Sequence, residues 1–468
     1  MSFSLSRNSI LLSYLLICQL IWISNSFSQQ SLILKYPSRT ITPYYFIPSI
    51  NESMGFIEIA NEDPLRDIFT YPGKSSKIVN SQIFLSFSNY IQNTVFNSFG
   101  DYGAEDYELN NHTWHIPFGG LLKWDKFIFG GLAGIGSDPQ KFKWNTWYKF
   151  EISPSTSSSS YTSGRNYFYC VFTNYQVDEK LNIGISLIGE KYSRERDFSP
   201  SSKLIYKNSI PLNIAGGLEY EITSSDLFSC TGLYYNLKEE FNQESIGPSW
   251  KHLILRPAEF KGWAFNFDYI RIFSEDTKIS SRLGIDFRKI KREDIYNGVV
   301  ARTKLGDALN WKLGLGLSHR QGNLLVVSEI FYEPGRNNEQ YEISTGSWDP
   351  SITGEEDFFY NWRARLGMQL KIWDLLKLHA GSEYHTQNVK RDFEYDYDFH
   401  TVVYPFISAA KFSLTTGFEI TLNSFALLYN FIYSSYTSRN YPHFNYWQYL
   451  EMMEVNPIQH RLMLSYEF

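Results

Sequence analysis

The chain is poor in cysteine, with three among 468 residues, and only Cys170 and Cys230 lie beyond the first thirty positions. Two cysteines so far apart do not make a disulfide framework, and the sequence leaves their pairing open. Beyond residue 28 there is no apolar run of about 20 residues, the length that a spanning helix needs. The sequence therefore predicts neither a disulfide-stapled domain nor a helical membrane protein.

Signatures of enzymes and metal proteins are missing from the sequence as well. The nine histidines are scattered, and none falls in a spacing such as His-Glu-x-x-His. His379 and His385 share a polar strand face with Glu383, but no serine nucleophile is placed beside them. The net charge of −6 argues against a nucleic-acid partner. We therefore expect no enzyme activity, no cofactor and no bound metal.

The first 28 residues have the layout of a secretory signal peptide. Arg7 supplies the positive start, an apolar stretch covers 9–23, and Ser26 and Ser28 occupy small-residue positions before Gln29. The apolar stretch is shorter than a spanning helix, which disfavours an uncleaved anchor. We expect residues 1–28 to be removed on export.

Long segments alternate between apolar and polar residues, as strands do when their two faces meet different surroundings. Odd positions from 309 to 317 are apolar and surround Lys312, and a run from 358 to 372 alternates Trp362 and Leu366 with Arg363 and Arg365. Runs of about 10 to 14 residues exceed most strands of soluble sandwiches and fit tilted membrane crossings. The pattern predicts an all-β fold, a transmembrane antiparallel β-barrel over residues 79–468, with the apolar positions facing lipid.

Short polar turns alternate with long loops along the predicted barrel. The turns lie at 124–126, 177–180, 223–226, 274–277, 321–323, 373–374 and 422–424. Short turns face the periplasm in bacterial outer-membrane barrels, and long loops face outwards. Seven short turns with both chain ends on the periplasmic side require 16 strands, while one mis-split pair would give 14. The sequence therefore predicts a barrel of 14–16 strands.

The chain ends in an alternating strand with an aromatic last residue. One face carries Leu462, Leu464, Tyr466 and Phe468. This ending is similar to the C-terminal signal by which outer-membrane barrels present their last strand to the insertion machinery. Together with the signal peptide, it predicts the bacterial outer membrane as the location, with outer-membrane lipid and the barrel-assembly machinery as partners.

Residues 29–78 precede the first clear strand and contain several turn-forming positions. The residues that stand out are Met54, Gly55, Phe56, Asp63, Pro64, Pro72 and Gly73. This stretch resembles the start of FadL-type transporters of long-chain fatty acids, with Tyr71-Pro72-Gly73 at the place of an Asn-Pro-Ala turn. The resemblance implies an N-terminal plug, or hatch, inside a 14-strand barrel that takes up hydrophobic compounds. We expect 29–78 to form a hatch-like segment, and a periplasm-facing leader is the alternative.

The polar faces of the predicted strands carry many charges. Inside a barrel such charges either form ladders across the wall or select anions and anionic head groups. The candidates for the lumen or for binding are Arg282, Asp286, Arg288, Lys312, Arg320, Arg363, Arg365, Lys371, Lys377, Glu383 and Glu419.

The sequence favours an outer-membrane channel for passive uptake of small, hydrophobic or amphipathic compounds. This function requires apolar hatch residues such as Phe46, Met54 and Ile57 to line a pocket with the barrel wall. A general polar-solute porin would instead need an open lumen, and a structural or secretion-accessory barrel would transport nothing. The sequence leaves the transported compound and the oligomeric state open.

Overall fold

The computed structural model of the protein describes its N-terminal segment from residue 48 and nearly all of its strands. The described residues are 48–61, 63–74, 78–100, 103–137, 140–148, 156–199, 202–247, 250–296, 299–343, 352–395, 406–440, 443–444, 447–448 and 450–468. The expected signal peptide and Phe46 lie outside this part. Helices α2 (Ile50–Ser53) and α3 (Pro64–Thr70) come first. No helix in the described ranges is both long and apolar enough to cross a membrane.

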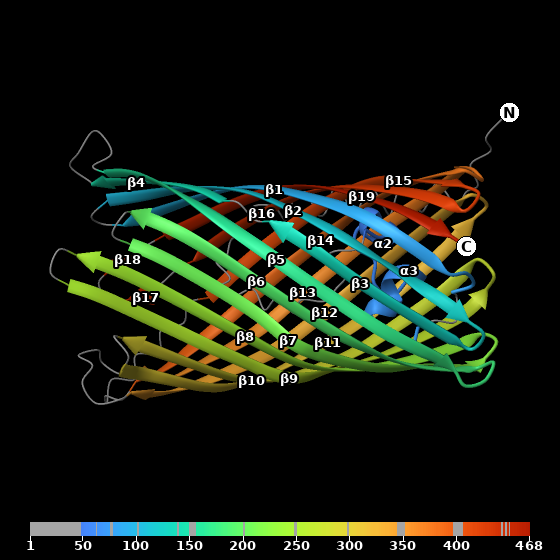
Figure 1. Ribbon diagram of the computed structural model, residues 1–468, viewed down its shortest axis with the longest axis horizontal. Helices are drawn as coiled ribbons and strands as arrows, with labels where there is room; N and C mark the ends of the chain where they lie inside the picture. Colours follow the sequence, from blue (N-terminus) through green and yellow to red (C-terminus); the bar gives the residue numbers. More distant parts are fainter. Residues whose placement is uncertain are drawn as a thin grey trace.

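The strands form one closed antiparallel barrel (Figure 1). In chain order they are β1 (Gln82–Gly100), β2 (Gly103–Trp124), β3 (Phe127–Ser137), β4 (Gln140–Tyr148), β5 (Thr156–Gln176), β6 (Leu181–Ser199), β7 (Ser202–Thr223), β8 (Asp226–Gly247), β9 (Trp250–Ser274), β10 (Thr277–Tyr296), β11 (Val299–Gln321), β12 (Leu324–Ile343), β13 (Ile352–Trp373), β14 (Leu376–Tyr395), β15 (Phe406–Leu422), β16 (Phe425–Asn440) and β19 (Leu450–Glu467). A separate two-stranded pair consists of β17 (His443–Phe444) and β18 (Trp447–Gln448).

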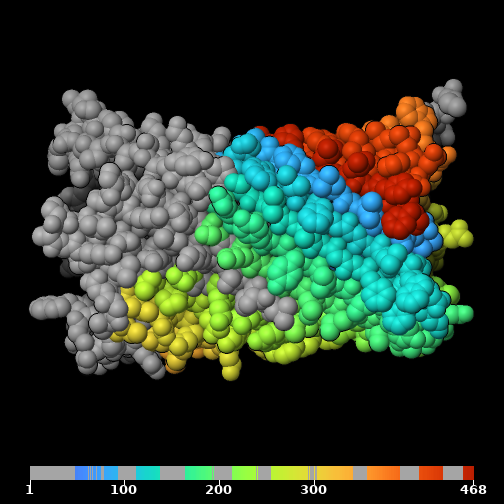
Figure 2. Space-filling view, viewed as in Figure 1, coloured from blue at the N-terminus to red at the C-terminus, as the bar shows by residue number. Residues whose placement is uncertain are grey.

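The barrel has 16 strands, because β3 and β4 act as one. Both pair with β2 on one side and with β5 on the other. The first and last strands, β1 and β19, pair along their length and close the barrel, so the two ends of the colour scale meet on its surface (Figure 2). The number that the seven short turns require is confirmed, and the 14 strands implied by the family resemblance are wrong for this chain.

Seven short turns join neighbouring strands at the expected places. They lie at 125–126, 177–180, 224–225, 275–276, 322–323, 374–375 and 423–424. Asp125, Gly322 and Asn423 have positive φ values of 51°, 58° and 53°. Gly, Asn and Asp tolerate this left-handed conformation better than other residues, which explains their use in tight hairpins.

An apolar belt surrounds the half of the barrel that carries the short turns. On β10 the outward positions from Ile279 to Phe287, nine residues, are apolar apart from Ser281, and Lys289 follows. Lys289 pairs in register with Lys261 of β9 and Asp307 of β11, so the belt ends at one row of charges on three strands. Nine residues match the 9 to 11 that a tilted strand needs to cross the hydrocarbon core.

The two faces of the strands are arranged as their alternation predicts. Leu315 is 60% exposed and Trp362 48% exposed on the outer surface. Arg365, three residues from Trp362, is buried inside the barrel. Cys170 and Cys230 are both free thiols.

Candidate functional site

The N-terminal segment lies inside the barrel, near the end that carries the short turns and the C-terminus (Figure 1). We call residues 48–61 and 63–74 the plug. Ser49 caps α2, since its hydroxyl accepts a hydrogen bond from the Asn51 amide at 3.1 Å and donates to Asp63 at 2.5 Å. The side chains of Asn51 and Asn61 bind each other at 2.7 Å. These bonds hold the segment between the two helices in a compact shape.

Apolar side chains of the plug pack against the barrel wall. Met54, Ile57 and Ala60 form a buried cluster with Val327 of β12. In the part of the plug that the structure describes, Met54 and Ile57 are thus enclosed by packing and do not line open space. With the plug docked these two side chains fit closely against the wall, and a pocket lined by them stays a prediction for the displaced plug.

A second apolar contact joins α3 to the opposite part of the wall. The Phe69 ring meets Phe84 and Phe172 edge-on, with ring centroids 6.0 and 5.0 Å apart. The same cluster contains inward-facing residues of β16, β19, β1, β2, β3, β5 and β6. One sector of the inner wall is therefore rich in apolar side chains.

Glycines of the wall make room for the plug backbone. A Cβ atom on Gly184 would lie 2.0 Å from the Pro72 carbonyl oxygen, and one on Gly381 would lie 2.1 Å from the Met54 carbonyl carbon. Gly367 faces Met54 from the adjacent strand at 2.3 Å. Real side chains do not approach backbone so closely, so only glycine permits this docking. The sequence pattern alone does not mark these glycines as part of the site.

Polar side chains of the wall satisfy the plug backbone. The buried carboxylate of Glu329 accepts hydrogen bonds from the amides of Glu58 at 2.9 Å, Ile59 at 2.5 Å and Ala60 at 2.6 Å. Asn430 donates to the Ser49 carbonyl, and Asn174 of β5 donates to the Pro72 carbonyl, at 2.8 and 2.7 Å. Buried backbone groups need such partners, so the wall specifies where the plug lies.

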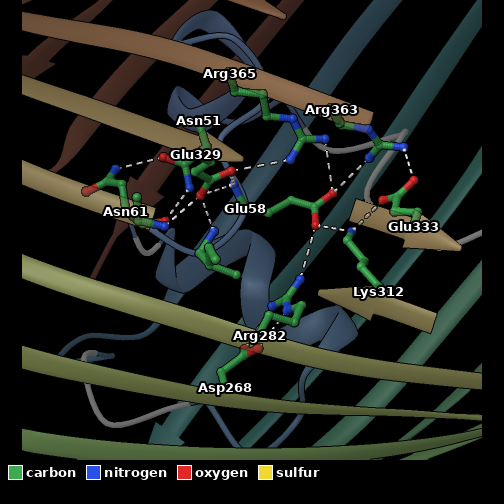
Figure 3. Close-up of polar contacts among 12 residues, drawn as sticks. Asn51, Glu58, Asn61, Asp268, Arg282, Lys312, Glu329, Glu333, Arg363 and Arg365 are labelled. Atoms are coloured by element: carbon green, nitrogen blue, oxygen red, sulfur yellow. Dashed lines mark hydrogen bonds and ion pairs between the residues drawn. The ribbon is translucent and has the colours of Figure 1, made fainter. Parts of the chain in front are cut away.

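Glu58 is the centre of the charged contacts between plug and wall (Figure 3). Its carboxylate lies 2.5 Å from the Lys312 amine, 3.1 Å from Arg282 and 3.2 Å from Arg365. Arg363 completes the set at 3.6 Å. These four cations come from the three strands β10, β11 and β13.

The electrostatics of this niche keep Glu58 ionised. Burial by itself would raise the pKa of Glu58, but the charges of Lys312, Arg365, Arg282 and Arg363 outweigh it and hold that pKa well below its usual value. The plug thus supplies an anion to a cationic niche in the wall.

Acidic residues of the wall balance the remaining positive charge. Arg282 binds Asp268 at 2.6 Å, Arg363 binds Glu333 at 3.2 Å, and Arg365 binds Glu383 at 3.0 Å. The cations and Glu383 belong to the residues predicted from the sequence, whereas Glu58, Asp268 and Glu333 do not. Val327 and Phe331 are apolar residues at inward positions of β12. They are a signal that could have indicated that this part of the inner wall is covered.

Two further ion pairs anchor the ends of the plug. Lys74 binds Asp268 at 2.8 Å, and Glu52 of α2 binds Arg461 of β19 at 2.8 Å. Burial would lower the pKa of Lys74, but Asp268 and Asp67 outweigh this effect and raise it. The plug is therefore held by ion pairs to both sides of the barrel.

The structure brings only some of the predicted lumen residues to the plug. Arg282, Lys312, Arg363, Arg365 and Glu383 gather there. Asp286 and Arg288 instead pair with each other on β10, and Tyr235 donates to Asp286 at 2.6 Å.

Four more of the predicted residues lie towards the short turns. Lys377 binds Glu419 at 3.0 Å, and Lys371 binds Asp374 of the neighbouring turn at 2.6 Å. Arg320 is exposed at the end of β11. These residues do not belong to the plug contacts.

The predicted hatch residues lie next to the two helices of the plug. Met54, Gly55 and Phe56 follow α2 directly, and Gly55 and Phe56 have positive φ values of 83° and 64°. Pro64 begins α3, and Gly73 contacts the backbone of Leu218.

At the other chain end, the predicted faces of the last strand are separated. Leu462, Leu464 and Phe468 are exposed on the outer surface, while Arg461 points inwards to the plug. Tyr466 and Phe468 stack with ring centroids 6.2 Å apart.

No family model matches the sequence, and no curated protein does. Among solved structures, the Pseudomonas putida toluene transporter TodX matches with a TM-score of 0.45 and 12% identity over 90% of this chain and 98% of that chain. A Pseudomonas aeruginosa FadL homologue matches with 0.46 and 11% over 94% and 100%. The Ralstonia pickettii toluene transporter TbuX matches with 0.33 and 10% over 88% and 97%. Each of these transporters is a solved structure to which this chain is similar at low sequence identity.

Proposed function

We propose that this protein is an outer-membrane channel for passive uptake of small hydrophobic or amphipathic compounds, and that its plug holds it closed. The observation that carries the proposal is the position of Glu58. Its partners Arg282 and Lys312 lie on the stretches of β10 and β11 that form the apolar belt. The plug therefore occupies the lumen at the depth of the hydrocarbon core.

The distribution of side chains inside the barrel supports an amphipathic route. The sector around Phe84 and Phe172 is apolar and is covered by α3, whereas the sector from β10 to β14 is charged and is covered by Glu58 and its neighbours. Displacement of the plug would expose both sectors to one passage. A compound with an apolar body and a polar end fits such a passage better than a fully polar solute does.

Conductance in planar bilayers tests whether the plug closes the channel. The intact protein should conduct little, and a variant lacking 48–74 should conduct strongly, because an unplugged barrel of this size holds water. Glu293→Gln, an outward residue paired with exposed Lys291, is the matched control and should stay closed. An intact protein that conducts like an open porin would refute the closed channel.

Uptake into vesicles tests the substrate class separately. Vesicles containing the intact protein should take up a labelled monoaromatic hydrocarbon or a medium-chain amphiphile faster than protein-free vesicles, and should not take up a labelled sugar. Equal rates for the sugar and the apolar compound would overturn the proposed substrate class and favour a general porin.

A further inference from the structure

A cavity of about 380 Å³ lies on the inner wall beside the turn that joins β11 to β12. Its lining includes three cationic side chains, Arg320, Lys371 and Lys377, together with the amides of Asn323 and Gln369. Leu370 and Leu378, next to the two lysines in sequence, are exposed on the outer surface, so the lysines face the lumen. The cavity therefore combines positive charge from three strands with neutral hydrogen-bonding groups.

The cavity is separate from the plug contacts. On β11 the plug approaches Gly316, where an added Cβ would lie 2.9 Å from Ala60. Arg320 lies four residues closer to the short turn, roughly 13 Å further along the strand. The cavity is thus found between the plug and the end of the barrel that carries the short turns.

The charges of this cavity are unbalanced. Lys371 and Lys377 are directly opposite each other in the register of β13 and β14, an arrangement that costs free energy when the charges are alike. Asp374 and Glu419 each bind one of these lysines. No carboxylate within the described residues contacts the Arg320 side chain, so three cations face two anions.

We propose that this cavity binds a small anion through a phosphate or carboxylate group. The planar guanidinium of Arg320 presents two parallel N–H donors to such a group, and the lysines act as point charges beside it. An anion between Lys371 and Lys377 also relieves their mutual repulsion. The site does not depend on the proposed uptake function, because none of its cations contacts the plug.

Isothermal titration of the full-length protein in neutral detergent at low salt tests this site. Inorganic phosphate and succinate are the two probes, and they separate phosphate from carboxylate recognition. We expect saturable binding of at least one probe, weakened about 10-fold or more by Arg320→Gln and by Lys371→Gln, the loss typical of one charged hydrogen bond. Lys289→Gln, at the outer edge of the apolar belt, is the matched control and should bind as the unaltered protein does.

Two results would overturn the proposal. One is the absence of saturable binding of both probes to the unaltered protein. The other is equal affinity of the unaltered protein and Arg320→Gln, when heat-modifiable mobility shows both barrels to be folded. A channel that proves open in bilayers leaves either result unaffected, so the two proposals fail independently.

Discussion

Glu58 and Arg365 are 307 positions apart in the chain and form an ion pair of 3.2 Å inside the barrel. Arg365 also forms an ion pair with Glu383, and the Glu383 carboxylate accepts a hydrogen bond from Lys411 at 3.0 Å. The plug is thereby attached to a charged network that crosses β13, β14 and β15. Removing one member of such a network leaves its partners uncompensated, which costs more than the pair itself contributes.

Glu58→Gln should weaken plug docking. The substitution keeps the shape but leaves four cations facing a neutral amide, and the expected loss is about 1 to 3 kcal/mol, below the value for a fully buried pair since Glu58 is partly exposed. Single-channel recordings should show a larger open fraction than in the unaltered protein. Glu293→Gln is the control, and an unchanged open fraction for Glu58→Gln would contradict the assigned role.

Gly381→Ala should displace the plug without preventing barrel formation. The new methyl group would overlap the backbone at Met54, and such overpacking costs about 1 to 3 kcal/mol. Limited proteolysis should cleave the plug faster than in the unaltered protein. Gly216→Ala is a matched control, because its nearest atom would be 4.0 Å away. Equal proteolysis of the two variants would argue against a tight fit at Gly381.

Closure of the channel by the plug should be insensitive to pH from about 5 to about 8. The pKa of Glu58 is lowered, so its contribution is present above the unfolded value near 4.3 and is lost as the pH falls through the lower folded value. The pKa of Lys74 is raised, so its contribution is present below the unfolded value near 10.4 and is lost as the pH rises through the folded value. Open fraction against pH is the measurement, and opening near pH 6 would contradict this account.

Phe468→Asp should leave export intact and impair assembly in the outer membrane. The Phe468 ring is 61% exposed and stacks on Tyr466, so it contributes little to the folded interior. Its amide donates to the Ser81 carbonyl at 3.0 Å, a bond that the substitution preserves. Heat-modifiable barrel in membrane fractions is the readout, with Phe468→Tyr as the control. Normal amounts for Phe468→Asp would count against an assembly signal.

The barrel could be predicted from the sequence because its determinants are local. Alternation along 309–317 follows from a wall with lipid on one side, and each tight turn has polar residues such as Asp125 or Asn423 at its tip. The plug contacts depend instead on tertiary structure. Nothing near Glu58 in the sequence indicates that Arg282 and Arg363, more than 200 positions away, converge on it.

The inner wall at the plug also departs from the rule that strands alternate. Val327, which the plug covers, and Phe331, whose ring lies under Lys312 and Arg365, are apolar and face inwards. The alternation of apolar and polar residues that reveals a lipid-facing strand is therefore hidden in this part of β12. Wall glycines such as Gly381 are equally uninformative in sequence, since a glycine can also mark a bulge or a turn.

The apolar belt ends at Lys261 on β9, yet that strand begins at Trp250, eleven residues earlier. At about 3.3 Å per residue this stretch covers roughly 35 Å along the strand. This part of β9 therefore extends beyond the lipid, and its outer end lies far from the bilayer surface. In the proposed uptake route, a solute from outside is enclosed by protein before it reaches the depth of the acyl chains, so the outer rim of the barrel, rather than the lipid, would be the first surface to select it.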